Sequence, residues 1–356
     1  MRRHVFRPMG RRILRSLRKR VLAEYDYIHV MNSGIHTEAI LKFLSSQLPE
    51  LRQAFIFPYP TNLSNRICKS NKNCFEFDLT DIPFKNVKKI IFHGLFSPGL
   101  INEIYKRKEL LEKSFWFIWG GDLYKSGDVS ESEKYVKTNF KGIITDFDKD
   151  EYVKRFGENK FYSATYPNYL KLEDIQLPKP KKESINILVN NCCDTTTLPI
   201  LSSLARFSDQ NIKIFTILSY VSSGQKSSFI DIIKTGYELF GNKFQPILKF
   251  MPAKIYSNFL SDIDIYISNQ DRAQGNGNAS FIAQAGGKVY VKSSSSIYKR
   301  YRSLGIYYYD TGNLDNLTFD EFIHYPEYER VTTMNGLNYR AADATKRAQW
   351  LSFLTD

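Results

Sequence analysis

The sequence predicts an α/β protein with two Rossmann-like domains, and two patterns support this. Short apolar runs rich in isoleucine, valine and phenylalanine alternate with stretches of helical periodicity, and several of the runs stop at glycine or asparagine. This alternation is typical of parallel sheets whose strands are buried on both faces. It is interrupted once, near residues 173–184, and then begins again. The 356 residues are enough for about two domains of the usual ~100–200 residues.

The first half of the chain contains six apolar runs that we expect to form strands. They are Tyr27–Met31, Ala54–Phe57, Cys74–Leu79, Lys89–His93, Phe115–Trp119 and Gly142–Phe147. Helical patterns occupy residues 37–46 and begin again near Pro98. The sequence therefore predicts an N-terminal domain over residues 25–172.

Residues 173–184 are rich in lysine and proline and lack an apolar pattern, which predicts an interdomain linker. Strands are then expected at Ile185–Val189, Ile212–Leu218, Phe244–Leu248, Ile263–Ser268 and Lys288–Lys292, and helices near residues 198–207, 227–240 and 253–260. This predicts a C-terminal domain over residues 185–335. Residues 336–356 are expected to form a C-terminal helix, a candidate to pack back on the N-terminal domain.

The formal charge is +13, and residues 1–20 carry nine positive charges and no acid. From Met9 to Leu22 apolar residues recur at three- and four-residue steps, so residues 1–24 are expected to be a basic amphipathic extension. Such a helix suits an anionic lipid surface. A frayed, solvated tail is the alternative, and nucleic-acid binding is disfavoured because no second basic stripe follows. We expect a cytoplasmic protein, peripheral on the inner face of the cytoplasmic membrane.

The cysteines and acids give little sign of a metal site. The four cysteines form no CxxC and have no neighbouring histidine in sequence, which disfavours zinc and favours a reducing compartment. Asp262 and Asp264 are separated by one residue, but this pair fits the start of a strand better than a metal site. We expect no metal and no cofactor.

The most informative segment is the strand, loop and helix over residues 263–287. An alternating strand pattern ends in a polar loop with Arg272 and Gln274, followed by Gly275-Asn-Gly-Asn278 and an apolar helical run. A glycine-rich turn before a helix lets backbone N–H groups approach a phosphate, and an arginine can add a bidentate fork. An ordinary βα connection with polar turn residues is the competing interpretation. Other polar residues also follow strands, and two such domains are expected to hold a ligand in a cleft between them.

Several of these strand ends match one family in order. The matching blocks are His29–Ser33, Phe92–Pro98 (Phe-His-Gly-Leu-Phe-Ser-Pro), Phe117–Tyr124 (Phe-Ile-Trp-Gly-Gly-Asp-Leu-Tyr), Ile187–Asn191 and Arg272–Gly277 (Arg-Ala-Gln-Gly-Asn-Gly). The combination resembles the bacterial aminofucosyltransferases of glycosyltransferase family 56, over about His29 to Ser293. Residues 1–24 look like an extension, and Asn276–Asn278 replace a more apolar stretch of the family.

The resemblance implies a GT-B glycosyltransferase that is inverting and metal-independent. It implies a nucleotide diphosphate donor such as TDP-N-acetylaminofucose, and a polyprenyl-diphosphate-linked glycan acceptor of the enterobacterial common antigen type or another surface glycan. Without a metal, protein groups must stabilise the negative charge of the leaving diphosphate. The expected donor-binding residues are Asn190, Asn191, Ser219, Tyr220, Gly224, Arg272, Gln274, Gly275, Asn276, Gly277 and Asn278.

An inverting transfer also needs a general base on the acceptor hydroxyl. Asp122 is the first candidate, because it follows Gly120 and Gly121 at a strand end, where its carboxylate could reach the cleft mouth; a plain helix cap is its alternative role. His36 and His93 compete with it, although His93 could be a core histidine and His36 a helix cap. Glu38 is a weaker option.

Two other functions remain open at this point. A soluble GT-B nucleotide-sugar epimerase would need no lipid acceptor and leaves the basic extension without a role. A non-catalytic nucleotide-sugar-binding module would keep Arg272 but need no base. Substitution of Asp122 distinguishes an enzyme from such a module.

Overall fold

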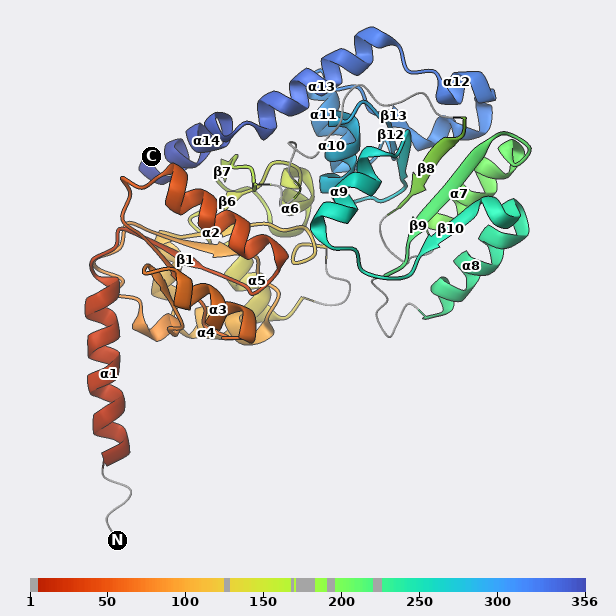
Figure 1. Cartoon of the computed structure of the whole chain (residues 1–356). Coiled ribbons are helices and arrows are strands. Elements are labelled where there is room, and N and C mark those ends of the chain that lie inside the picture. The colour runs from red at the N-terminus through yellow and green to blue at the C-terminus, as the bar shows by residue number, and fades with distance from the viewer. Residues whose placement is uncertain (1–5, 125–128, 168–169, 171–182, 191–195, 220–225) are drawn as a thin grey trace. The chain divides into compact units, whose positions relative to one another are not determined.

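The structure is a computed structural model, and it describes residues 6–124, 129–167, 170, 183–190, 196–219 and 226–356. The chain divides into two compact units (Figure 1). One comprises Met1–Pro167 together with Asp343–Asp356, and the other comprises Asn168–Ala342. Most of the expected linker over residues 173–184 lies outside the described residues.

The first unit is built on a seven-stranded sheet in the order β3-β2-β1-β4-β5-β6-β7. Its strands are β1 Tyr27–Val30, β2 Gln53–Ile56, β3 Cys74–Phe75, β4 Lys89–His93, β5 Ser114–Phe117, β6 Gly142–Ile144 and β7 Phe161–Tyr162. Every pair is parallel. The order reverses between β1 and β4, which makes this the topological switch point, where ligands of such sheets bind.

Helices connect and cover these strands. They are α1 Phe6–Leu22, α2 Ile35–Gln47, α3 Asn62–Ser70, α4 Pro98–Lys106, α5 Glu131–Thr138, α6 Lys149–Phe156 and α14 Asp343–Thr355, with 3-10 turns η1 Leu79–Asp81 and η2 Lys108–Lys113. Local sequence sets several of the helix starts. In α4, for example, the Ser97 hydroxyl accepts the Leu100 N–H at 3.3 Å, and Pro98 occupies the first position, where no N–H is needed.

The second unit repeats the plan with a six-stranded parallel sheet, in the order β10-β9-β8-β11-β12-β13. Its strands are β8 Ile185–Val189, β9 Ile212–Ile217, β10 Phe244–Ile247, β11 Ile265–Ser268, β12 Lys288–Val291 and β13 Tyr309–Asp310. Its helices are α7 Thr197–Leu204, α8 Lys226–Phe240, α9 Ala253–Ser261, α10 Asn276–Gln284, α11 Ser296–Ser303, α12 Phe319–Ile323 and α13 Glu327–Ala341, with 3-10 turns η4 Ala205–Phe207, η6 Gly241–Lys243 and η7 Thr311–Asn316. The switch point here lies between β8 and β11.

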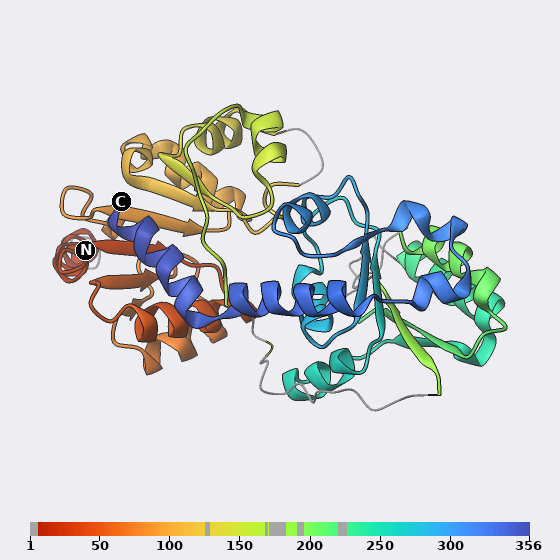
Figure 2. The ribbon, with the colours of Figure 1, turned by 90° about the horizontal axis from the view of Figure 1, so that it is seen from above.

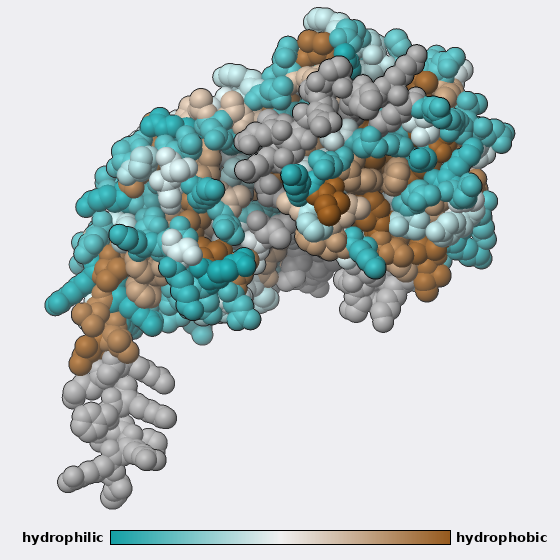
Figure 3. Space-filling model, viewed as in Figure 1, coloured by the Kyte–Doolittle hydropathy of each residue, from teal (hydrophilic) through white to brown (hydrophobic). Residues whose placement is uncertain are grey.

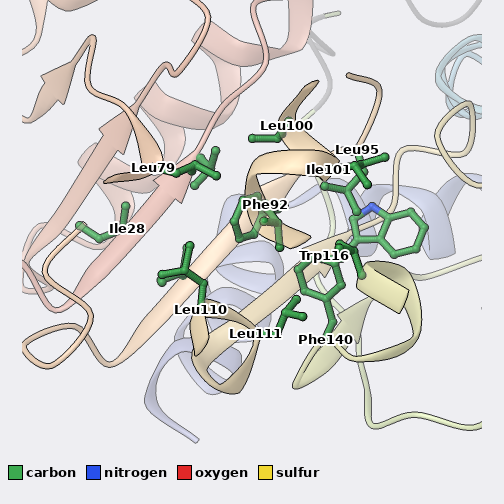
Figure 4. Close-up of a cluster of buried hydrophobic side chains, with 14 of the residues drawn as sticks. Ile28, Leu79, Phe92, Leu95, Leu100, Ile101, Leu110, Leu111, Trp116 and Phe140 are labelled. Atoms are coloured by element: carbon green, nitrogen blue, oxygen red, sulfur yellow. The ribbon is translucent and has the colours of Figure 1, made fainter. Parts of the chain in front are cut away.

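Both faces of the first sheet are buried. On one face, side chains of β1, β4 and β5, among them Ile28, Phe92 and Trp116, form one apolar cluster with those of α4 (Figure 4). On the other face α14 lies over the strands (Figure 2). There the fully buried Trp350 stacks on Phe117 with ring centres 5.8 Å apart. The last helix of the chain therefore completes the core of the first unit.

The predicted strands are present, but one is much shorter than expected. Of the run Cys74–Leu79, only Cys74 and Phe75 pair with the neighbouring strand β2, and the 3-10 turn η1 begins at Leu79. The Asp81 carboxylate accepts the Asp78 N–H at 3.1 Å and pairs with Arg18 of α1 at 3.3 Å, which draws the chain away from the sheet. The single helix expected over residues 336–356 is also wrong, because Ala342 is extended with ψ 136° and separates α13 from α14.

The helix expected near the N-terminus is confirmed as α1. Its residues Ile13, Leu14 and Leu17 are 57%, 57% and 50% exposed, whereas Leu22 is fully buried in the core of the first unit. Figure 3 shows hydrophobic surface along the described part of this helix. Among the residues that the structure describes, no helix is both long and apolar enough to cross a membrane.

Candidate functional site

An asparagine joins the two strand ends at the switch point of the first sheet. The Asn32 amide, just after β1, donates to the carbonyls of His93 and, at 3.0 Å, Gly94 at the end of β4. Gly94 has a φ of +82°, and a Cβ there would lie 2.6 Å from the ring of Phe96. Only glycine fits this position without strain, because side chains disfavour that conformation and the space is already occupied.

Asp122 is buried beneath this edge, with 2% of its surface exposed. Its Oδ2 accepts the Leu95 N–H at 2.9 Å and the Trp116 indole N–H at 2.7 Å, and its Oδ1 accepts the Trp119 N–H at 3.0 Å. Burial raises the pKa of this carboxyl, and these hydrogen bonds oppose the rise. The expectation of an open carboxylate at the strand end is therefore wrong. Asp122 instead joins the loops that follow β4 and β5.

His93 is fully buried in a chain of polar side chains. The Gln53 amide nitrogen donates to two backbone carbonyls at the end of α2, so its oxygen faces His29 Nε2, 3.2 Å away. His29 Nε2 then carries the proton, and His29 Nδ1 accepts from His93 Nε2 at 2.9 Å. His93 Nδ1 is left to accept from the Tyr166 hydroxyl.

This chain keeps both histidines neutral. Burial lowers the pKa of His29 to about 3 and that of His93 well below its usual range. His93 was a candidate for the general base, but it has no exposed surface from which to reach an acceptor. That expectation is wrong, and the core-histidine alternative holds.

His36 is the remaining candidate at this edge. It lies in the first turn of α2, half-buried, with its ring edge-on to Trp119 at a centroid distance of 5.7 Å. Trp119 also meets Phe96 and Tyr166 edge-on, at 6.1 and 5.2 Å. Burial lowers the pKa of His36, so the imidazole is neutral near pH 7 and able to accept a proton.

The second sheet has an asparagine in the corresponding place. Asn190 follows β8 with a φ of +48° and is 1% exposed. Its Oδ1 accepts the Asn269 N–H after β11 at 3.0 Å, and its amide donates to the hydroxyls of Thr196 and Thr197 at 3.1 and 3.0 Å. Its side chain is thus fully used in ordering the switch point. Direct donor binding by Asn190 stays a prediction, and in this structure its side chain instead orders the loops.

Some of the expected donor residues cannot be placed. Asn191, Tyr220 and Gly224 lie outside the described residues. Ser219 is half-buried and follows β9 at the carboxyl edge of the same sheet, the edge that Asn190 orders.

Arg272 lies in the loop after β11, half-buried, where its Nε donates to the Gln274 side-chain oxygen at 2.7 Å. This bond fixes one edge of the guanidinium. The group forms no ion pair with any residue in the described part of the chain. Arginine held in this way presents its remaining N–H groups as a fork for an oxyanion.

The turn after this loop starts α10. Gly275 caps the helix with a φ of +75°, and among the residues that the structure describes no side chain caps the first turn. The backbone N–H groups of Asn276 and Gly277 therefore stay available at the positive end of the helix dipole. Asn278 differs from expectation, because its side chain is 6% exposed and donates to the Tyr256 hydroxyl at 2.6 Å. It packs α10 against α9.

Asp262 and Asp264 lie at the opposite edge of the sheet, before β11 begins. The Asp264 carboxylate accepts the Asn186 N–H at 2.9 Å, and that of Asp262 accepts the Asn186 amide at 2.8 Å. Among the described residues, no group of three or more histidines, cysteines and acids could hold a metal ion.

The Gln270 amide also donates to the Thr196 hydroxyl, at 2.9 Å. The sequence reasoning missed several residues of these networks: Gln53, Tyr166, Thr196, Asn269 and Gln270. Asn269 could have been found, because it follows β11 just as Asn190 follows β8. Tyr166 could not, because it comes after the last strand of its sheet, in a segment without periodic pattern.

Comparison with solved structures shows the fold. A glycosyltransferase from Rickettsia africae ESF-5 has a TM-score of 0.66 at 10% identity, over 93% of this chain and 98% of that one. A UDP-forming α,α-trehalose-phosphate synthase from Burkholderia xenovorans has a TM-score of 0.64 at 10% identity, over 93% and 99%. The structure described as "Trehalose-6-phosphate from E. coli bound with UDP-2-fluoro glucose" has a TM-score of 0.62 at 8% identity, over 93% and 99%. The chain thus has the GT-B fold, with two parallel-sheet α/β domains.

No curated protein matches the chain. The sequence pattern of one family does match, over residues 26–315, and this family is described as "4-alpha-L-fucosyltransferase glycosyl transferase group 56". The match spans both sheets and all the loops described above. The chain therefore belongs to the 4-alpha-L-fucosyltransferase group 56 family and is a nucleotide-sugar glycosyltransferase.

Proposed function

We propose that this glycosyltransferase moves a deoxyamino sugar of the aminofucose type from a nucleoside diphosphate to a polyprenyl-diphosphate-linked glycan or another surface glycan. The transfer inverts the anomeric carbon and uses no metal. The acceptor oxygen attacks that carbon, the bond to the diphosphate breaks, and the acceptor proton passes to a base. A TDP-sugar is the donor that the family resemblance favours.

The observation that carries this proposal is the uncapped start of α10 behind Arg272. The leaving diphosphate gains negative charge as its bond breaks, and something must stabilise it. The first-turn N–H groups of Asn276 and Gly277, the helix dipole and the guanidinium of Arg272 all supply positive potential at one edge of the second sheet. Gln274 orients the guanidinium.

We propose His36 as the general base. Its lowered pKa keeps it neutral, and its position after β1 puts it at the carboxyl edge of the first sheet. Asp122 supports it indirectly, because Asp122 accepts the backbone N–H of Trp119, whose ring packs against His36. The binding-module alternative needs no base and gives no role to this neutral histidine.

The acceptor side of the proposal rests on α1. The nine positive charges in residues 1–20 and the exposed Ile13, Leu14 and Leu17 suit an anionic bilayer surface. Lipid-linked glycans are carried in such a surface. We therefore propose a peripheral location on the inner face of the cytoplasmic membrane.

A transfer assay with defined substrates tests the function. The protein is incubated in EDTA with TDP- or UDP-linked deoxyamino sugars and a polyprenyl-diphosphate-linked oligosaccharide, and the products are analysed by mass spectrometry and for anomeric configuration. We expect one sugar to be added, with inverted configuration. Interconversion of the free nucleotide sugar without transfer would favour an epimerase, and binding without turnover would favour a non-catalytic module. Activity that requires Mg²⁺ or Mn²⁺ would contradict the metal-free mechanism.

A further inference from the structure

A second exposed apolar surface lies on the second unit. Directly after β10, Leu248 and Phe250 are 51% and 65% exposed, and Ile255, in the first turn of α9, is 57% exposed. We call residues 248–255 the apolar loop. Water-exposed side chains of this size, gathered within eight residues, mark an interaction surface more often than chance exposure.

Topology places the apolar loop at the same edge as the donor residues. All strands of the second sheet are parallel, so the segments that follow β10 and β11 emerge at one edge. β10 is the outermost strand, which puts the loop at a corner of the domain. In α8, Ile230 is 62% exposed and lies near the helix start, which comes from this edge. Figure 3 shows hydrophobic surface over the part of the second unit where Figure 1 labels α8 and α9.

The charges of this region narrow the choice of partner. Residues 239–261 contain Lys243, Lys249 and Lys254 and no acid, and both lysines of the apolar loop are exposed. In α8, next to the exposed Ile230, Asp231 is followed three residues later by Lys234, and Asp271 in the loop after β11 is paired with Lys292 at 2.6 Å. Lysines alternating with large apolar side chains match an anionic lipid surface, where the apolar groups enter the acyl boundary and the ammonium groups remain among the headgroups.

We propose that the apolar loop is a second membrane contact, in which Leu248, Phe250 and Ile255 insert into an anionic bilayer. The proposal rests on the proposed function, because a lipid-linked acceptor gives the second unit a reason to touch the membrane. With this contact both units bind lipid, α1 through its positive charges together with Ile13, Leu14 and Leu17, and the apolar loop mainly through apolar burial. Binding by the loop should therefore persist at high salt concentration, where electrostatic attraction is screened.

Vesicle binding of the full chain tests this. The variant F250S/I255S is compared with wild type by co-sedimentation with phosphatidylglycerol–phosphatidylethanolamine vesicles, at ~0.1 M salt and at ~1 M salt, where the Debye length falls to about 3 Å. We expect roughly tenfold weaker partition of the variant at the higher salt, since two large side chains lose their burial. The control Y328S/Y339S removes two side chains of α13 that are each 72% exposed, and it should bind as wild type.

Equal partition of F250S/I255S and wild type at both salt concentrations would overturn the proposal, and so would an equal loss in the control. Thermal unfolding of each variant establishes that it is folded. The proposed function fails separately: if wild type transfers no sugar to a lipid-linked acceptor but the apolar-loop variant still loses vesicle binding, the membrane contact stands without that function. If transfer occurs and vesicle binding is unaffected, the function stands and the contact falls.

Discussion

The indole of Trp119 stands edge-on to the imidazole of His36, with their planes inclined by 82°. The backbone of Trp119 is in turn fixed by Asp122, which has no exposed carboxylate of its own to offer. Asp122 and His36 were both candidates for the general base. In the structure they belong to one arrangement, in which Asp122 fixes the backbone of Trp119 and the ring of Trp119 packs against His36.

Replacing His36 by glutamine should reduce turnover by about 10²–10⁴, because the acceptor hydroxyl loses its base. Nucleoside diphosphate affinity should persist, since the residues that we propose to bind the donor belong to the second sheet. In wild type the rate should fall as pH drops through the lowered pKa of His36, below its usual 6.5, and the variant should lack this limb. H324Q, at an exposed histidine, is the matched control. Turnover within a few-fold of wild type would move the base elsewhere.

Asp122→Asn should destabilise the first unit by about 1–3 kcal/mol, measured by urea unfolding. The carboxylate accepts three N–H groups, whereas an asparagine offers one acceptor oxygen and turns an NH₂ toward a buried donor. Unchanged stability together with a hundredfold loss of turnover would instead restore Asp122 as the base.

Arg272→Ala should weaken nucleoside diphosphate binding by roughly 1.5–3 kcal/mol, the range for a charged hydrogen bond. Isothermal titration calorimetry measures the change. Arg302→Ala is the control, because that arginine is exposed and lies in the last turn of α11, 5.2 Å from the ring centre of Tyr307. Equal losses in the two variants would mean that general positive charge, not Arg272, attracts the diphosphate.

The His29–His93 pair should make the protein sensitive to mild acid. The pKa of His29 is about 3 in the folded state and near 6.5 when unfolded, so the unfolded chain binds more protons between these values. Stability is complete above pH 6.5 and falls as pH decreases, by up to about 1.4 kcal/mol per pH unit for each such histidine. Unfolding free energies between pH 6.5 and 5, where ordinary carboxylates stay ionised, measure the slope. A flat profile would mean that the pair is protonated in the folded protein.

Changing Ile13, Leu14 and Leu17 to serine should lower binding to anionic vesicles and slow reaction with a long-chain lipid acceptor. The rate with a short, water-soluble acceptor should stay the same. Substitution is preferable to deleting residues 1–22, because the deletion would remove the buried Leu22 and the Arg18–Asp81 ion pair. Equal vesicle binding at low salt would show that the exposed face of α1 does not engage lipid.

Sequence patterns predicted eleven of the thirteen strands that the structure describes, because most of them are apolar runs. They missed β7 Phe161–Tyr162 and β13 Tyr309–Asp310, which are only two residues long and too short to show a pattern. The patterns did not predict the hydrogen bonds of polar side chains whose partners lie far away in the sequence. Asp122 was correctly placed after two glycines at a strand end. Its partner Leu95 comes from the loop after β4 and its partner Trp116 from β5, and no local pattern shows that they converge on it. Asn278 was placed in the correct turn, yet its amide faces the hydroxyl of Tyr256, which lies 22 residues earlier in the chain.

The position of α14 has a consequence for biosynthesis. Trp350, Phe353 and Leu354 belong to the core of the first unit, yet the ribosome makes them after every residue of the second. Until they emerge, one face of the first sheet lacks its cover, so His29 and Phe117 are left partly open to water or to a chaperone. The second unit does not depend on residues made later, because Asn168–Ala342 form one continuous stretch of chain. We therefore expect synthesis to reverse the usual order, with the later domain maturing first and the earlier one closing last.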